Sequence, residues 1–188
     1  MLNIWNNNEL VQILKSGGVA VMPTDTIYGI VGRAEDRAVV ERIYKIRKRN
    51  ESKPCIVLIS EWSEVLRFGV EITKMQENFL KENFPAPRPT TIILDCTKEK
   101  FVYLYKGMVS LAFRIPQNQD LINLLKQTGP LVAPSANTEG YPPSANIEQA
   151  KNYFGDLVDI YIDGGELSSN ASRIIRLFND GNVDIIRE

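Results

Sequence analysis

The chain has 188 residues, of which 44% are hydrophobic and 24% charged, and its formal net charge is −1. These values are typical of a globular protein with one sizeable core, and they argue against a uniformly basic surface while leaving a local basic patch open. The sequence contains no histidine, which excludes histidine acid–base chemistry, histidine triads and histidine metal ligands.

The first residues, MLNIWNNNEL, carry no secretory signal, and no apolar run approaches the length of a membrane span. We therefore expect a cytoplasmic protein without membrane contact. In that compartment Cys55 and Cys96 are expected to be reduced core residues rather than a disulfide.

Apolar periodicity, glycines and prolines divide the chain into alternating helices and strands. Helices are predicted after the asparagines at 6–8, ending at Gly17, and at 37–49, 61–68, 72–84, 118–129 and 147–155. Strands are predicted at 19–24, 29–36, 52–60, 90–96, 109–116, 131–137, 157–165, 172–177 and 183–188. Because several strands are neighbours in sequence, the pattern predicts one α/β (α+β) domain over 1–188, with helices covering a mixed sheet.

Four segments carry candidate chemistry, and the first is YKIRKRNESKP at 44–54. Its cations suit phosphate groups, although a solvated charged helix face would look the same. Lys45 and Arg47 stand two residues apart, so they converge on one ligand only if the helix frays there or the ligand lies over its end. The segment continues through Lys48, Arg49 and Lys53.

The other three segments are equally ambiguous alone. Ser135 and Asn137 follow a strand in APSANTEGYPPS, where they would bind a nucleotide or form an ordinary turn. In PTDTIYG, Thr24, Thr26 and Tyr28 would share one face of an extended segment, either in a pocket or because strands favour these residues. Arginines 173, 176 and 187 lie in or beside late strands, where surface placement is the ordinary explanation.

No glycine-rich phosphate loop of the common kinds is present. Taken in order, however, the segments resemble the YrdC-like family of threonylcarbamoyl-AMP synthases, in its short, single-domain form. The resemblance covers nearly the whole chain: P-T-D-T-I-Y-G at 23–29, K-I-R at 45–47, K-P-C-I-V-L at 53–58, P-R-P-T-T-I-I-L at 87–94, S-L-A-F-R-I-P at 110–116, A-P-S-A-N at 133–137 and I-D-G-G at 162–165. The pair K-x-R and S-x-N distinguishes the family.

The resemblance implies a twisted sheet around a deep concave pocket and a nucleotidyltransferase that makes L-threonylcarbamoyladenylate and pyrophosphate from L-threonine, bicarbonate and ATP. Mg²⁺ is implied with the ATP, held mainly by phosphates, with no metal site on the protein. Partner proteins would then modify tRNA, and direct tRNA or RNA contact is a further expectation.

The resemblance also implies roles for individual residues. Lys45 and Arg47 would be catalytic; Thr26, Tyr28, Ser110, Arg114 and Ser172 would bind threonine; and Lys45, Arg47, Ser135, Asn137 and Arg187 would bind ATP. In this scheme the cations at 45 and 47 meet the hydroxyl and amide at 135 and 137 in one cleft.

Three positions depart from the family pattern: Arg88 replaces a customary glycine, Arg173 a threonine and Arg176 an aspartate. Two alternatives remain open. One is an RNA-binding protein of the same fold without adenylation activity, using a basic surface that includes Arg42 and Lys45. The other is a carbamoyl transferase of the hydrogenase-maturation kind, although such domains sit in longer chains with zinc-binding parts.

Overall fold

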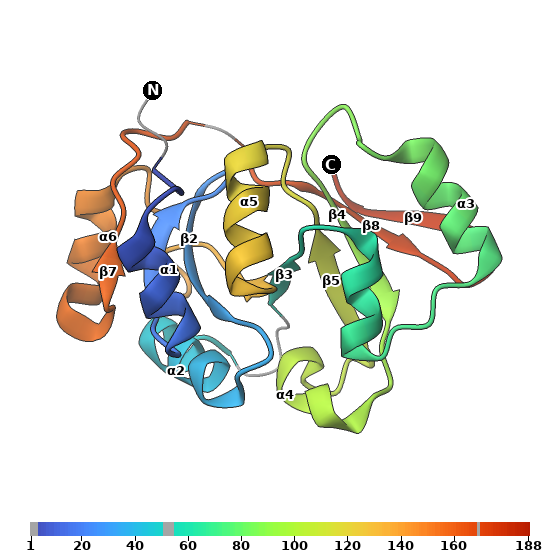
Figure 1. The fold of residues 1–188 in the computed structure, drawn as a ribbon, viewed down its shortest axis with the longest axis horizontal. Coiled ribbons are helices and arrows are strands. Elements are labelled where there is room, and N and C mark those ends of the chain that lie inside the picture. Colours follow the sequence, from blue (N-terminus) through green and yellow to red (C-terminus); the bar gives the residue numbers. More distant parts are fainter. Residues whose placement is uncertain (1–3, 51–54, 169) are drawn as a thin grey trace.

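The computed structural model describes residues 4–50, 55–168 and 170–188. Within them, nine strands form one sheet in the order β7-β1-β2-β6-β3-β5-β4-β8-β9 (Figure 1). The strands are β1 (Ala20–Pro23), β2 (Tyr28–Arg33), β3 (Ile56–Leu58), β4 (Thr90–Asp95), β5 (Ser110–Arg114), β6 (Leu131–Val132), β7 (Ile160–Tyr161), β8 (Arg173–Leu177) and β9 (Val183–Arg187). The helices are α1 (Asn8–Lys15), α2 (Arg37–Arg47), α3 (Lys74–Asn83), α4 (Val102–Tyr105), α5 (Gln119–Thr128) and α6 (Ile147–Phe154), with 3-10 turns at Trp62–Phe68, Glu99–Phe101 and Gly155–Leu157.

The sheet is mixed, as the sequence predicts. β1 and β7, β3 and β5, and β4 and β8 pair in parallel, whereas the other neighbours are antiparallel. β3, β4 and β5 are consecutive in the chain, but β5 lies between the other two in the sheet. Their registers determine which side chains meet on each face.

Side-chain caps explain where several helices begin. Asn7 accepts from the backbone N–H of Leu10 at the start of α1, and Asp36 caps α2 in the same way. Thr73 and Gln76 form a reciprocal capping box at α3. Each cap satisfies backbone donors that a helix end leaves without a partner.

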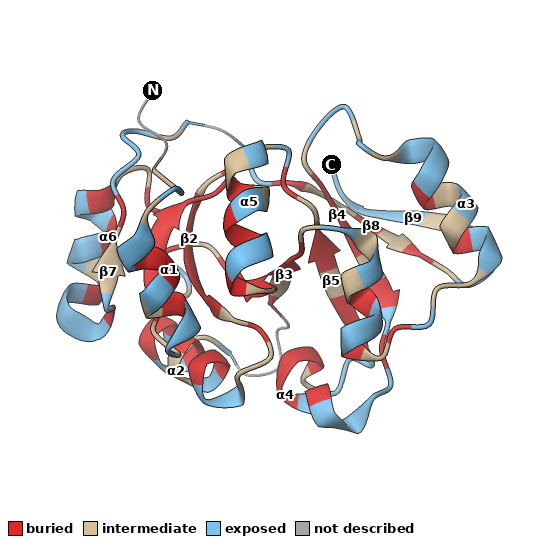
Figure 2. Cartoon of the chain, in the orientation of Figure 1, coloured by how far each residue is buried: buried red, intermediate tan, exposed pale blue. Residues whose placement is uncertain are grey.

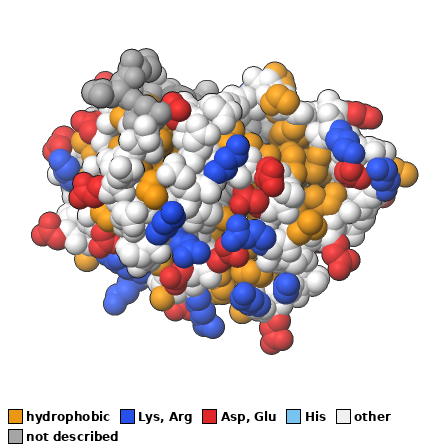
Figure 3. All heavy atoms as spheres, in the orientation of Figure 1, with side chains coloured by type: hydrophobic (Ala, Val, Ile, Leu, Met, Phe, Trp, Pro, Cys, Tyr) orange, Lys and Arg blue, Asp and Glu red, His pale blue; other side chains and the backbone are white. Residues whose placement is uncertain are grey.

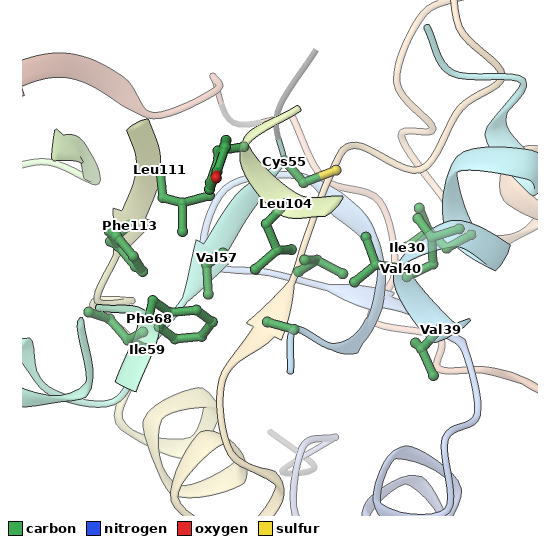
Figure 4. Packing of buried hydrophobic residues seen from close by; sticks show 14 of the residues in the cluster. Ile30, Val39, Val40, Cys55, Val57, Ile59, Phe68, Leu104, Leu111 and Phe113 are labelled. Atoms are coloured by element: carbon green, nitrogen blue, oxygen red, sulfur yellow. The ribbon is translucent and has the colours of Figure 1, made fainter. Parts of the chain in front are cut away.

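Apolar side chains pack on both faces of the sheet. On one face, α1 and α5 contribute leucines such as Leu10, Leu14 and Leu124, and Figure 2 shows both helices buried along one side and exposed along the other. The opposite face packs against α2 and α4, where Phe68 lies beside Ile59 and its ring centroid is 5.5 Å from that of Phe113 (Figure 4). Layers on both faces support a sheet whose central strands are almost fully buried.

Three details differ from or complete the sequence prediction. Residues 62–68 form a 3-10 segment rather than an α-helix, and α4 was not predicted, because its aromatic and β-branched residues show no helical periodicity. Cys55 and Cys96 are free and buried, as expected. Among the described residues, the helices are too short or too polar to span a membrane.

Candidate functional site

A cavity of about 310 Å³ lies against the centre of the sheet. Its floor is apolar, because Ile56 and Ile93 are both register partners of Ala112 across β3, β4 and β5 and all three line the cavity. The walls bring polar groups from distant segments, namely Thr24, Thr26, Arg49, Arg114, Ser135, Ser172 and Arg187. An apolar floor with a few convergent polar groups is typical of a small-molecule site.

The first wall is the turn that joins β1 to β2. Thr24 closes it: its backbone N–H and its hydroxyl both donate to the carbonyl of Ile27, at 3.0 and 2.7 Å, and its Oγ1 accepts from the N–H of Thr26 at 3.3 Å. Thr24 and Thr26 line the cavity, but the segment is a turn rather than extended. The predicted common face for both threonines and Tyr28 is therefore wrong.

Arg114, at the end of β5, faces this turn. Its guanidinium donates to the hydroxyls of Thr26 at 3.2 Å and Thr24 at 3.5 Å, and its Nη2 lies 3.0 Å from Oδ1 of Asp25. The Arg114 side chain is only 4% exposed, and its buried Nε has no hydrogen-bond partner among the described residues.

The electrostatics of Arg114 follow from this burial. Desolvation lowers the pKa of its guanidinium, the Asp25 carboxylate opposes that effect, and Arg187 adds to it. An arginine nevertheless stays protonated at neutral pH. Arg114 therefore keeps a positive charge in the cavity wall, beside the Asp25 carboxylate, and a positive charge there suits an anionic group such as a carboxylate.

A second wall is the segment after β6, where Ser135 lines the cavity and pairs with Gly29 in an isolated bridge. Arg47, from the end of α2, holds this segment. Its Nε donates to the Asn137 carbonyl at 3.0 Å, and its Nη2 donates to Asn137 Oδ1 at 3.1 Å and to Ser135 Oγ at 3.2 Å. The Asn137 amide in turn donates to the carbonyls of Thr138 and Tyr141.

Arg47 and Asn137 thus lie behind the wall rather than in it. Arg47 is 2% exposed and Asn137 6%, and neither lines the cavity. Burial, followed by the nearby Arg49, lowers the pKa of Arg47 to about 10, so it remains charged at neutral pH. Its Nη1 is buried without a hydrogen-bond partner among the described residues.

Lys45 lies apart from this cluster. It is exposed and lines a basic groove between α2 and α4 with Arg37, Lys48, Arg49 and Lys106, and Figure 3 shows basic side chains over these helices. Residues two apart on a helix differ in direction by about 200°, which explains why Arg47 joins Ser135 and Asn137 whereas Lys45 does not. Arg49 lines both the groove and the cavity. Lys53, the last cation of the segment, lies outside the described residues.

A third wall comes from the end of the chain. Ser172 lines the cavity and shares a hydrogen bond of 2.8 Å with Thr91, while Arg187 donates twice to the Ser172 carbonyl. The unusual arginines lie nearby: Arg88 and Arg173 both pair with Glu188, and Arg176 pairs with Asp95. The Arg88 pair joins the last residue of the chain to the segment before β4, and the Arg176 pair joins β8 to the end of β4.

Tyr28 and Ser110 lie outside the cavity lining. The Tyr28 hydroxyl donates to the carbonyl of Gly165 at 2.8 Å and accepts from the N–H of Gly164 at 2.9 Å, and burial raises its pKa. Ser110 is buried at the other end of β5, four residues from Arg114 and therefore on the same face of the strand. Tyr28 thus anchors the segment at 163–165.

Sequence reasoning missed Asp25 as part of the site. It stands between two threonines that were selected, but on an extended strand it would point to the opposite face. Because the segment is a turn, its carboxylate reaches Arg114 instead. The signal available in the sequence was an acidic residue at the tip of a turn.

Comparison with known proteins agrees with this architecture. The human threonylcarbamoyl-AMP synthase is 30% identical over 167 residues, which cover 87% of this chain and 57% of that protein. The structure of Escherichia coli YciO superposes with a TM-score of 0.80 at 28% identity, over 96% of this chain and 87% of that one.

The structure of Pyrococcus abyssi Sua5 complexed with L-threonine superposes with a TM-score of 0.81 at 26% identity. It covers 93% of this chain, but this chain spans only 51% of that one. The family model for Sua5, YciO and YrdC, described as "Telomere recombination", matches residues 12–188. The chain therefore belongs to the Sua5/YciO/YrdC family.

Proposed function

We propose that this protein is a threonylcarbamoyl-AMP synthase, a nucleotidyltransferase that forms L-threonylcarbamoyladenylate and pyrophosphate from L-threonine, bicarbonate and ATP. The observation that carries the proposal is the buried Arg114 guanidinium, which faces a cavity of about 310 Å³ together with threonine and serine hydroxyls. Relatives with this name, and a similar protein solved with L-threonine, support it.

Arg114 is the proposed partner of the threonine carboxylate, because it lines the cavity and a guanidinium donates charge-assisted hydrogen bonds to carboxylates. The hydroxyls of Thr26 and Ser172 lie on two walls and would hydrogen-bond the amino acid. We assign Tyr28 and Ser110 supporting roles, because Tyr28 anchors the segment at 163–165 and Ser110 continues the cavity face of β5.

The phosphates of ATP would lie where the cavity meets the basic groove. Arg49 lines both, and Lys45 lies in the groove on the adjacent turn of α2. Ser135 and Arg187 are proposed ATP contacts from the cavity side. Arg47 and Asn137 would contribute by holding Ser135 in place, and Arg47 would add positive charge behind the wall.

The reaction would begin with attack of the threonine nitrogen on the bicarbonate carbon, which forms the N–C bond of a carbamate and releases one molecule of water. A carbamate oxygen then attacks the α-phosphorus of ATP, the new P–O bond forms, and the bond from that phosphorus to the β-phosphate oxygen breaks to release pyrophosphate. Nucleophile and target are both anionic, so alignment and cationic screening supply the catalysis without a covalent intermediate.

Mg²⁺ with the ATP is part of the proposal. Among residues 4–50, 55–168 and 170–188, no three His, Cys, Asp or Glu side chains gather in a way that would hold a metal ion. We propose that triphosphate oxygens and water would bind the ion. We further propose a cytoplasmic location and transfer of the product to proteins that modify tRNA, with the basic groove as the surface nearest to any bound RNA.

The test is release of pyrophosphate by purified protein with ATP and Mg²⁺, omitting one substrate at a time. Release should require threonine and bicarbonate together, and mass spectrometry should detect the adenylate. Equal release without threonine would count against the proposal. Tight RNA binding without ATP turnover would favour the RNA-binding alternative.

A further inference from the structure

We propose that Asp25 is a positioning residue for threonine recognition: it holds the Arg114 guanidinium in the orientation that receives the carboxylate of the amino acid. The inference deepens the proposed function and rests on it. It assigns a role to the acidic residue of the β1–β2 turn, which does not itself line the cavity.

The Asp25 carboxylate joins two segments. Its Oδ1 lies 3.0 Å from Nη2 of Arg114, and its Oδ2 accepts from the backbone N–H of Gln117 at 3.1 Å. The side chain of Gln117 then donates to the carbonyl of Ala86 at 2.7 Å. The Asp25 side chain is only 4% exposed, so this contact is largely shielded from solvent.

The contacts of Arg114 fix both terminal nitrogens of its guanidinium. Nη2 points to Asp25 and Thr24, and Nη1 points to the hydroxyl of Thr26. Nε has no hydrogen-bond partner among the described residues, although it is buried. An arginine side chain has four rotatable bonds. Its guanidinium therefore keeps one orientation toward a ligand only if other groups of the protein hold it there.

Charge provides a second reason for the role of Asp25. Above an apolar floor, an uncompensated cation would be costly to bury, and a carboxylate in contact offsets that cost. Thr24 and Thr26 cannot substitute, because their hydroxyls are neutral and do not offset the charge of the guanidinium. Asp25 does not itself line the cavity, so it would not contact the substrate carboxylate.

The experiment measures steady-state kinetics of Asp25→Asn, which keeps the shape and one oxygen acceptor but removes the charge. We expect the KM for threonine to rise about tenfold, equivalent to about 1.4 kcal/mol. The KM for ATP and kcat should stay within about twofold of wild type, because the side chain of Asp25 contacts Arg114 and Gln117, neither of which is a proposed ATP contact. Asp95→Asn is the matched control, because Asp95 pairs with Arg176 on the surface, and it should change neither KM.

A double-mutant cycle separates positioning from a general structural effect. If Asp25 acts through Arg114, Asp25→Asn should add little in an Arg114→Lys background, whereas independent effects would multiply. Thermal unfolding of each variant checks folding. Should Asp25→Asn prove unstable, Asp25→Glu replaces it, since it keeps the charge but displaces the carboxylate and should give the same threonine-specific rise.

An unchanged threonine KM overturns the inference, and so does a parallel loss in the threonine KM, the ATP KM and kcat. The wild-type protein is assayed first. If its pyrophosphate release does not depend on threonine, the proposed function itself has failed. That result is distinct from a threonine-dependent wild type whose Asp25 variants behave normally, which rejects only the role of Asp25.

Discussion

Arg47→Lys tests whether the arginine of the K-x-R segment is part of the architecture or a free phosphate ligand. Arg47 makes three hydrogen bonds from Nε and Nη2 to Ser135 and Asn137, and it is 2% exposed. A lysine ammonium places its charge and its donors at one nitrogen, so it cannot reproduce the planar set of donors of the Arg47 guanidinium. We expect it to keep about one of the three bonds.

The size of the loss follows from that count. A hydrogen bond to a charged group contributes roughly 1.5–3 kcal/mol, so losing two lowers the free energy of unfolding by about 3–6 kcal/mol. This is a large part of the roughly 5–15 kcal/mol that stabilises a typical domain. Because Arg47 holds Ser135 in the cavity wall, turnover should fall as well.

Urea unfolding followed by tryptophan fluorescence measures the change. Arg37→Lys is the matched control, because Arg37 lies on the same helix but is exposed, with its side chain 68% accessible and paired with Glu41. The control should shift the free energy of unfolding by no more than about 0.5 kcal/mol. A loss below about 1 kcal/mol for Arg47→Lys, with turnover abolished, would refute the architectural role and restore Arg47 as a direct ligand.

The remaining predictions concern separate parts of the chain. Lys45→Ala should reduce turnover severely while the free energy of unfolding changes by no more than about 0.5 kcal/mol, because Lys45 is exposed; unchanged turnover would remove it from the site. Thr24→Val should cost about 1–3 kcal/mol of unfolding free energy in urea titrations, since it deletes the hydroxyl bonded to Ile27; a neutral effect would contradict that. Asp159→Asn should flatten the acid side of the stability–pH curve. Its hydrogen bond from Arg42 lowers the pKa of Asp159 below the ordinary 3.8, so this stabilisation is present above that value and disappears as pH falls through the folded pKa; an unaltered curve would contradict the assignment.

Local sequence signals were sufficient for most of the fold. Caps such as Asn7 and stops such as Gly129 predict helix ends, and a mixed sheet follows from neighbouring strands. The helix predicted at 61–68 is a 3-10 helix, and α4 was missed, because their conformation depends on packing around Phe68 and Phe101 rather than on periodicity. The local sequence pattern of a segment does not reveal tertiary contacts of this kind.

The site divides in the same way. The sequence predicted the kinds of functional group at the site. Hydroxyls near 24–28, cations near 45–49 and a polar loop near 135–137 line or support the cavity. The orientation of these side chains could not be predicted from the sequence, because whether Lys45 or Arg47 points inward depends on how α2 packs against the sheet. The role of Asp25 could not be predicted either, because its contact with Arg114 spans 89 positions of sequence and depends on where β5 lies.

The residues of the K-x-R and S-x-N pair have two different roles: two of them support the cavity wall, and the other two line the groove or the cavity. Arg47 and Asn137 form hydrogen bonds mostly with each other and within the loop that follows β6. Lys45 instead lines the basic groove, and Ser135 lines the cavity. A chain that kept the first pair but lost Lys45 should therefore retain the wall of the cavity without the reaction. Conversely, losing Arg47 should displace Ser135 even if every residue facing the cavity were intact, because the hydroxyl would have lost the group that orients it.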